Sequence, residues 1–268
     1  MGGNAFKGPN DEPLSASIKR EEVRPTVAYV VEIIADVGDL DVELLGSSGK
    51  KEMSGDIDLA VGPIPADVPA KQFKDTLLKI CAAALGTEHA RLVGQNIALN
   101  VPIRTDDPER EGLRVQIDLM LSSNPEQTAW LMAGTAGGPT EVKGVYRNLL
   151  LAYIAKKRGE MTGQKITISY PGGIQVLRDG EVVVPRTEDP GTIISTLGLS
   201  GTPADLLTFD SVFDAAQGLI DLDGFAAYIE PTVKRDPEEG MKAMDALNKK
   251  MTGPGMLREM IRNMLRYI

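Results

Sequence analysis

Residues 42–60 constrain the fold most, because two short apolar segments flank a polar loop within them. Residues 42–45 and 56–60 each predict a strand. Side chains at positions i and i+2 of a strand share a face. We therefore expect Asp56 and Asp58 to project side by side, while the residues between and after them face a core.

Two carboxylates on one face repel each other. At 4 Å and an effective dielectric near 20 the repulsion is about 4 kcal/mol. A chain tolerates this where a cation lies between the carboxylates or where water solvates both. Hard oxygen ligands of this kind suit Mg²⁺, which proteins hold with one or two carboxylates plus substrate phosphates. The alternative is an exposed, solvated pair at a strand end, without a ligand.

The turn after the first strand contains Gly46, Ser47 and Ser48. Such a turn offers backbone N–H groups and a hydroxyl to an anion, and glycine lets a phosphate approach the backbone closely. Lys50 and Lys51 add positive charge in the same loop. An ordinary surface turn with solvated lysines is the alternative interpretation.

The order of strand, Gly46-Ser47, polar loop and Asp56-Ile57-Asp58 strand resembles the signature of the DNA polymerase β-like nucleotidyltransferase superfamily. That signature also contains a third carboxylate on a later strand. Residues 114–120 alternate in polarity and place Asp118 on the polar face. The resemblance covers roughly residues 20–122. Many members carry Arg or another polar residue where this chain has Gly49, which leaves the triphosphate contact open.

The resemblance implies nucleotidyl transfer with two Mg²⁺ ions, for which Mn²⁺ can substitute. Asp56 and Asp58 would hold both ions. Asp118 would bind only the ion beside the attacking oxygen and help to take its proton. A solvent-facing aspartate is the alternative for this residue.

The resemblance also implies a site for a nucleoside triphosphate. Gly46 and Ser47 would bind the β- and γ-phosphates, with Ser48 in the same turn. Lys50 or Lys51 would neutralise the leaving pyrophosphate.

Two basic patches favour a nucleic-acid acceptor such as an RNA 3′ end, although such rows are also typical of solvated helix faces. The first patch consists of Lys143, Arg147, Lys156, Lys157 and Arg158; the second consists of Lys249, Lys250, Arg258, Arg262 and Arg266. A protein side chain or a small molecule remains open as acceptor. So does a non-catalytic nucleotide-binding or structural protein with this fold. The oligomeric state is left open as well.

The composition limits the class of protein. The chain has 268 residues with 42% hydrophobic content, enough for a core and two domains. Its net charge of −9 argues against broad nonspecific coating of nucleic acids. The single cysteine, Cys81, is expected to be a buried thiol, and the single histidine, His89, a surface residue. With one histidine, a multi-histidine zinc site within the chain is excluded.

We expect a disordered or extended N-terminus over 1–14, a catalytic domain over 15–123 and a mostly helical domain over 124–268. The fold class is α/β (α+β), with a small mixed sheet and helices on one face. No apolar run long enough for a membrane span and no signal peptide is found, which predicts a cytoplasmic protein.

Two segments of the first domain are expected to be helical. They are 15–37, with Val27, Val30, Val31 and Ile34 on one face, and 71–85, ending at Gly86. Pro25 either kinks the first helix or begins a second one. A hairpin is expected over 91–101, around Gln95 and Asn96.

The second domain is expected to begin with a short helix over 125–132. A helix over 141–159 should present Val145, Leu149, Ala152 and Tyr153 on one face. A small β-hairpin region near 165–184 and several helices from about 190 complete it.

Overall fold

The structure is a computed structural model that describes residues 5–46, 48–65, 67–133, 144–169, 172–216, 218–234, 237, 240–241 and 243–245. The chain divides into two compact units, the N-terminal unit Met1–Ala129 and the C-terminal unit Trp130–Ile268. The sequence places the boundary a few residues earlier, after 123. The α+β class predicted from the sequence is confirmed.

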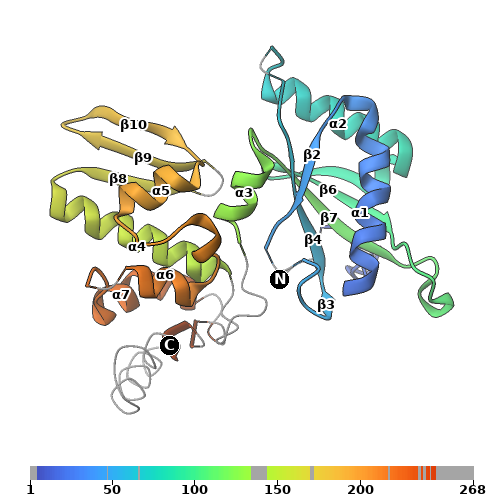
Figure 1. The fold of residues 1–268 in the computed structure, drawn as a ribbon. Helices are drawn as coiled ribbons and strands as arrows, with labels where there is room; N and C mark the ends of the chain where they lie inside the picture. Colours follow the sequence, from blue (N-terminus) through green and yellow to red (C-terminus); the bar gives the residue numbers. More distant parts are fainter. Residues whose placement is uncertain are drawn as a thin grey trace. The chain divides into compact units, whose positions relative to one another are not determined.

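The N-terminal unit consists of helices separated by groups of strands along the chain (Figure 1). These are β1 (Ile18–Lys19), α1 (Arg20–Ile34), β2 (Asp41–Leu44), β3 (Met53–Ser54), β4 (Asp56–Gly62), α2 (Ala70–Leu85), β5 (Ala90–Val93), β6 (Asn96–Pro102) and β7 (Arg114–Leu121), followed by α3 (Pro125–Leu131) at the division between the units. Short 3-10 turns lie at Ala35–Val37, Thr87–His89 and Pro108–Arg110.

Five of these strands form a mixed sheet in the order β2-β4-β7-β6-β5. Strands β4 and β7 are parallel, and the other neighbours are antiparallel. Strands β1 and β3 form a separate antiparallel pair. The hairpin between β5 and β6 turns at Gly94 and Gln95, one residue earlier than predicted, because Val93 pairs with Asn96.

Helices α1 and α2 pack on the same face of this sheet. Their buried apolar side chains form one core with the inward residues of β4, β6 and β7. The inward residues are Ile57, Leu59, Val61, Ile97, Leu99, Val101, Val115, Ile117 and Leu119. The other face carries the intervening residues, which are mainly polar.

Helix α1 is shorter than predicted and runs continuously through Pro25. Val30 and Ile34 are buried as expected, but Val31 is exposed. Val23 and Thr26, which were not predicted, are buried together with Val30 and Ile34. Helix α2 ends as predicted, with the Gly86 N–H donating to the Ala82 carbonyl.

The N-terminus predicted as disordered or extended is an ordered loop from Ala5 onward. Phe6 is buried, and the Arg91 guanidinium lies 4.3 Å from the centre of its ring. The Leu14 N–H donates to the Phe6 carbonyl at 3.0 Å. An aromatic anchor therefore fixes this segment.

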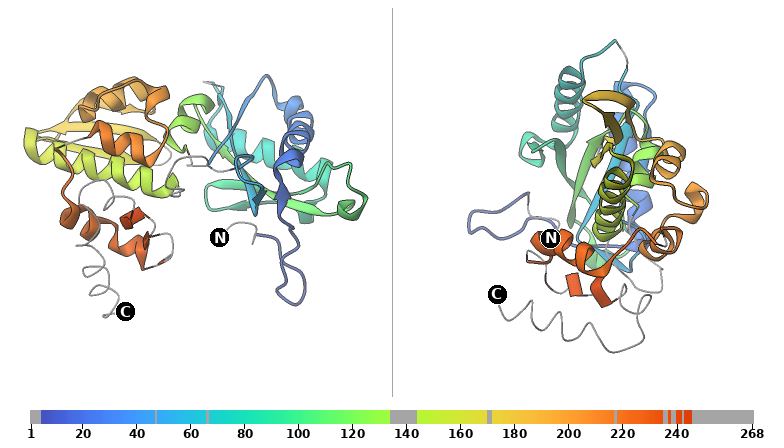
Figure 2. Two further views of the ribbon diagram at one scale, coloured as in Figure 1. Left: turned by 60° about the horizontal axis from the view of Figure 1, so that its bottom comes forward. Right: turned by 90° about the vertical axis from the view of Figure 1, so that its left-hand side faces the viewer.

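The C-terminal unit contains a three-stranded antiparallel sheet in the order β10-β9-β8 and several helices (Figure 2). Its elements are α4 (Gly144–Thr162), β8 (Lys165–Ser169), β9 (Gly173–Arg178), β10 (Glu181–Thr187), α5 (Pro190–Leu197), α6 (Phe209–Ala215) and α7 (Leu222–Val233), with a 3-10 turn at Pro203–Asp205.

The buried face of α4 differs from the predicted one. Tyr153 is buried as expected, but Val145 is exposed and Leu149 is only partly buried. Helix α4 contacts β8 as well as α6 and α7, so a wide face is buried. Among the described residues, no helix has both the length and the apolar character needed to cross a membrane.

Candidate metal centre

Three aspartates meet on the polar face of the five-stranded sheet. Parallel pairing of β4 with β7 sets Asp58 opposite Asp118, and alternation along β4 puts Asp56 on the same face. One carboxylate oxygen from each residue lies within 4.8 Å of the other two. This group can hold a metal ion.

The environment of Asp58 and Asp118 disfavours negative charge. Burial raises the pKa of Asp58 to about 7, and the charges of Asp56 and Asp118 add to the effect. Burial also raises the pKa of Asp118, against the effect of a hydrogen bond from Gln116 and together with the charge of Asp56. A cation among these groups would relieve the cost of ionising them.

The turn at Gly46 lies next to Asp58. Gly46 has a φ of +60°, which favours glycine, and a Cβ built there would lie 4.0 Å from Asp58 Oδ2. Ser48 is buried, and its hydroxyl accepts a hydrogen bond from the Asp58 N–H at 3.2 Å. Ser48 thus joins the turn to β4. Ser47 lies outside the described residues.

The two loop lysines differ in their contacts. Lys50 is exposed, and its Nζ donates to the Gly46 carbonyl at 3.0 Å. Lys51 is also exposed. Arg20 at the start of α1 donates to the carbonyls of both lysines, at 2.9 Å and 3.4 Å. The sequence interpretation missed Arg20, because nothing local marks a contact across about thirty residues.

Gln116 was also missed as a site residue, although its place on the polar face of β7 was expected. Its Nε2 donates to both carboxylate oxygens of Asp118. Alternation along the strand predicts that Gln116 and Asp118 share a face, but it does not reveal the hydrogen bonds between their side chains.

The first basic patch is not a continuous surface, which corrects the sequence interpretation. Arg147 is fully buried and donates to the carbonyls of Leu206 and Leu131. Lys157 pairs with Asp221 at 3.1 Å. Lys143 and the whole second patch, residues 249–266, lie outside the described residues.

Cys81 is buried as predicted, and burial raises its thiol pKa to about 12. It is therefore not a nucleophile at neutral pH. His89, expected to be a surface residue, is partly buried: its side chain is 22% exposed and its Nδ1 is buried. Burial and the charge of Arg114 lower the pKa of His89.

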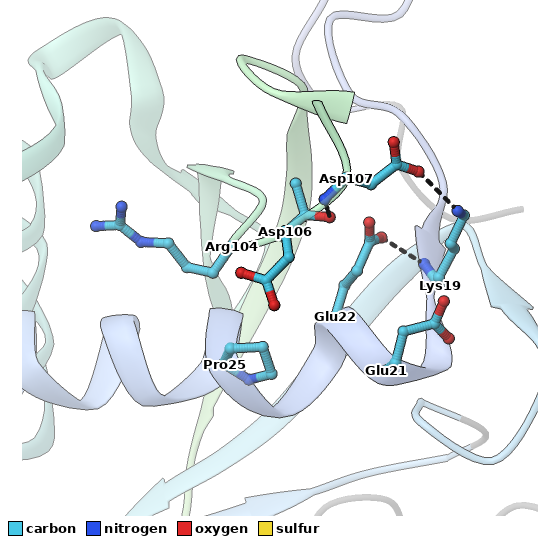
Figure 3. Close-up of a pocket in the computed structure, with 8 residues that line it drawn as sticks. Lys19, Glu21, Glu22, Pro25, Arg104, Asp106 and Asp107 are labelled. Carbon is cyan, nitrogen blue, oxygen red and sulfur yellow. Dashed lines mark hydrogen bonds and ion pairs between the residues drawn. The ribbon is translucent and has the colours of Figure 1, made fainter. Parts of the chain in front are cut away.

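A cavity of about 540 Å³ lies at the start of α1 and beside the connection between β6 and β7 (Figure 3). None of the three aspartates lines it. Lys19 Nζ binds Asp107 at 3.0 Å, and the Lys19 N–H donates to Glu22. Burial opposes the charge of Glu22, but hydrogen bonds from Arg110 and Lys19 lower its pKa overall. Lys19 thus pairs with two of the acidic groups that line the cavity, and the cavity is separate from the three aspartates.

A comparison with protein-family models finds no match, and a comparison with curated protein sequences finds none either.

Proposed function

We propose that this protein is a metal-dependent nucleotidyltransferase. One observation carries the proposal: Asp56, Asp58 and Asp118 converge from two adjacent parallel strands, beside a turn at Gly46. All three ligands are hard oxygen donors, which suit Mg²⁺ and also accept Mn²⁺. Asp56 and Asp58 would hold two ions and Asp118 one of them. When bound, such ions stabilise the attacking and the leaving oxygens.

The reaction would join an acceptor hydroxyl to the α-phosphorus of a nucleoside triphosphate. Asp118 would accept the hydroxyl proton at a carboxylate oxygen as the new oxygen–phosphorus bond forms. The bond between the α-phosphorus and the pyrophosphate then breaks. Gly46 would let the β- and γ-phosphates approach the backbone, and Lys50 and Lys51 would attract the leaving pyrophosphate.

The acceptor we propose first is an RNA 3′ end. With Arg147 buried, this rests on the basic residues of the second patch and on exposed Lys156. A protein side chain and a small molecule are the alternatives that the same centre would serve. A non-catalytic nucleotide-binding protein differs from all of these, because it binds a triphosphate without turnover.

The test is incubation with each α-labelled nucleoside triphosphate, Mg²⁺ and either total RNA or cell extract. We expect label in an acceptor together with released pyrophosphate. Asp56→Asn, Asp58→Asn and Asp118→Asn should each reduce the rate by about 10²-fold or more. Asp67→Asn is the matched control, because it removes an exposed carboxylate outside the centre and should leave the rate unchanged.

Two results would separate the alternatives. Triphosphate binding without transfer to any acceptor would favour the non-catalytic protein. Wild-type rates in all three aspartate variants would overturn the proposal.

A further inference from the structure

Gln116 is a buried amide that holds Asp118. It is 5% exposed, and its Nε2 lies 3.0 Å from each carboxylate oxygen of Asp118. It precedes Asp118 by two positions in β7 and lies opposite Asp56 of β4. Hydrogen bonds from one amide to both oxygens fix the rotation of that carboxylate.

The other end of the Gln116 amide is fixed by the backbone. Its Oε1 accepts a hydrogen bond from the Ala5 N–H at 2.7 Å. A backbone N–H can only donate, so the amide oxygen must face Ala5. The amide nitrogen must then face Asp118, which needs a donor. The orientation of Gln116 thus follows from its two neighbours.

Ala5 belongs to a segment that we name the N-terminal strap, residues 5–17. The strap is fastened to three strands of the sheet. Phe6 is buried beneath Arg91 of β5. Ser15 Oγ donates to Asn100 Oδ1 of β6 at 3.2 Å, and the Ala16 N–H donates to the Arg114 carbonyl of β7 at 2.7 Å.

We propose that the strap and Gln116 act together as a positioning relay for Asp118, an inference that rests on the proposed function. The Ala5 N–H fixes Gln116, and Gln116 holds the Asp118 carboxylate against repulsion from Asp56 and Asp58. Without the relay, the carboxylate rotates and its oxygens no longer converge with the other two. Gln116 is a positioning residue, because it acts on the reaction only through Asp118.

The experiment measures Mn²⁺ affinity by electron paramagnetic resonance of the free ion, without any nucleotide. Gln116→Met keeps the length of the side chain and removes both donors. Ala5→Pro removes only the backbone donor. Each change should weaken Mn²⁺ binding about tenfold, as loss of a partner behind a metal ligand does. The metal-free melting temperatures should stay within a few degrees of wild type. Gln95→Met, at an exposed turn, is the matched control.

The double variant separates a relay from two independent structural effects. If Ala5 acts through Gln116, the double variant should bind Mn²⁺ no more weakly than Gln116→Met alone. In the transfer assay, both single variants should lower kcat while the KM for the triphosphate stays within about twofold of wild type. If the two single changes each lower the Mn²⁺ affinity about tenfold and these factors multiply in the double variant, the relay is overturned.

The outcome also distinguishes this inference from the proposed function. Asp118→Asn should weaken Mn²⁺ binding at least as much as Gln116→Met. If Asp118→Asn does so and neither Gln116→Met nor Ala5→Pro does, the relay is overturned and the metal centre stands. If wild type binds no Mn²⁺, both are overturned. If Gln116→Met fails to fold, wild-type affinity in Ala5→Pro alone overturns the relay.

Discussion

Single residues carry the chemistry of this protein through their surroundings more than through their identity. Asp58 is an ordinary aspartate in sequence, but burial and two neighbouring carboxylates raise its pKa to about 7. Arg147 looks like a surface cation in sequence, yet it is buried and donates to backbone carbonyls. In both cases the neighbours of the group, and not its residue type, set its charge state or its contacts.

We predict that Asp58→Asn changes the pH dependence of stability in the metal-free protein. The folded-state pKa of about 7 lies above the ordinary value of 3.8. Between these values Asp58 binds more protons in the folded state than in the unfolded state, so the contribution of this group to stability falls as pH rises from about 4 to 7. Asparagine does not titrate. With EDTA the two proteins should melt alike near pH 4, and the variant should melt about 3–8 °C higher at pH 8.

Saturating Mg²⁺ should reverse this order at pH 8, because the ion stabilises only the protein with the complete carboxylate set. Titrating groups far from Asp58 are common to both proteins and cancel in the difference, whereas Asp56 and Asp118 interact with Asp58 and belong to the same effect. A difference in melting temperature that stays constant from pH 4 to 8 would contradict the raised pKa.

We predict that Arg147→Leu destabilises the protein by about 2–4 kcal/mol. The change leaves the buried carbonyls of Leu206 and Leu131 without this donor, and each orphaned group costs about 1–3 kcal/mol. Chemical unfolding followed by circular dichroism measures the loss. Lys156→Gln, on the exposed face of the same helix, should change stability by less than about 0.5 kcal/mol. Equal losses in the two variants would show that Arg147 is a surface residue after all.

Among the elements, the pair β4 and β7 is decisive, because its parallel register creates the centre. The pairing Asp58 to Asp118 and Asp56 to Gln116 sets two polar rows side by side. The turn at Gly46 and the N-terminal strap then approach these rows from separate parts of the chain. Each element supplies one side of the site, and none supplies it alone.

We predict that Gly46→Ala weakens triphosphate binding without affecting Mg²⁺ alone. The matched control is Gly94→Ala, because the φ angles of +60° and +59° are nearly equal and Gly94 has open space around it. Both variants should lose about 1–2 kcal/mol of stability from the left-handed backbone. Calorimetry should show reduced triphosphate affinity only for Gly46→Ala, since its new methyl group would occupy the space at the turn where the β- and γ-phosphates are proposed to approach the backbone. Equal triphosphate affinity in the two variants would remove the turn from the site.

At the scale of the whole molecule, the two units have separate cores. Among the described residues, the two clusters of buried apolar side chains share no member. Trp130, the only tryptophan, belongs to the C-terminal core and donates to the Pro203 carbonyl at 2.8 Å. The three aspartates belong to the N-terminal unit. Trp130 and the candidate metal site therefore lie in different units.

We predict that Mg²⁺ raises the melting temperature of the N-terminal unit and not that of the C-terminal unit. Units with their own cores unfold separately unless a large apolar interface joins them. Calorimetry should show two transitions, of which only one moves with Mg²⁺. Trp130 fluorescence should follow the transition that does not move. A single transition that moves with Mg²⁺ by both methods would show that the units unfold together.

Several local features of the fold could be predicted from the order of residues alone. Alternation along the strands predicted that Asp56 and Asp58 of β4 share one face and that Asp118 lies on the polar face of β7. Only the neighbouring residues are needed for this prediction, because successive side chains of a strand point to opposite faces. Helix α2 and its end at Gly86 followed from helical spacing and a glycine cap. The resemblance also named three aspartates far apart in the chain as one candidate centre.

Which distant segments meet depends on long-range packing, and it was seen first in the folded protein. Gln116 and Ala5 are 111 positions apart, and no local pattern encodes that contact. The same holds for Arg147, since i, i+4 spacing fixes a helix face but not whether that face is buried. The neighbours that cover α4 from β8, α6 and α7 come from later in the chain. Local periodicity sets the direction of a side chain, and long-range packing decides what it touches.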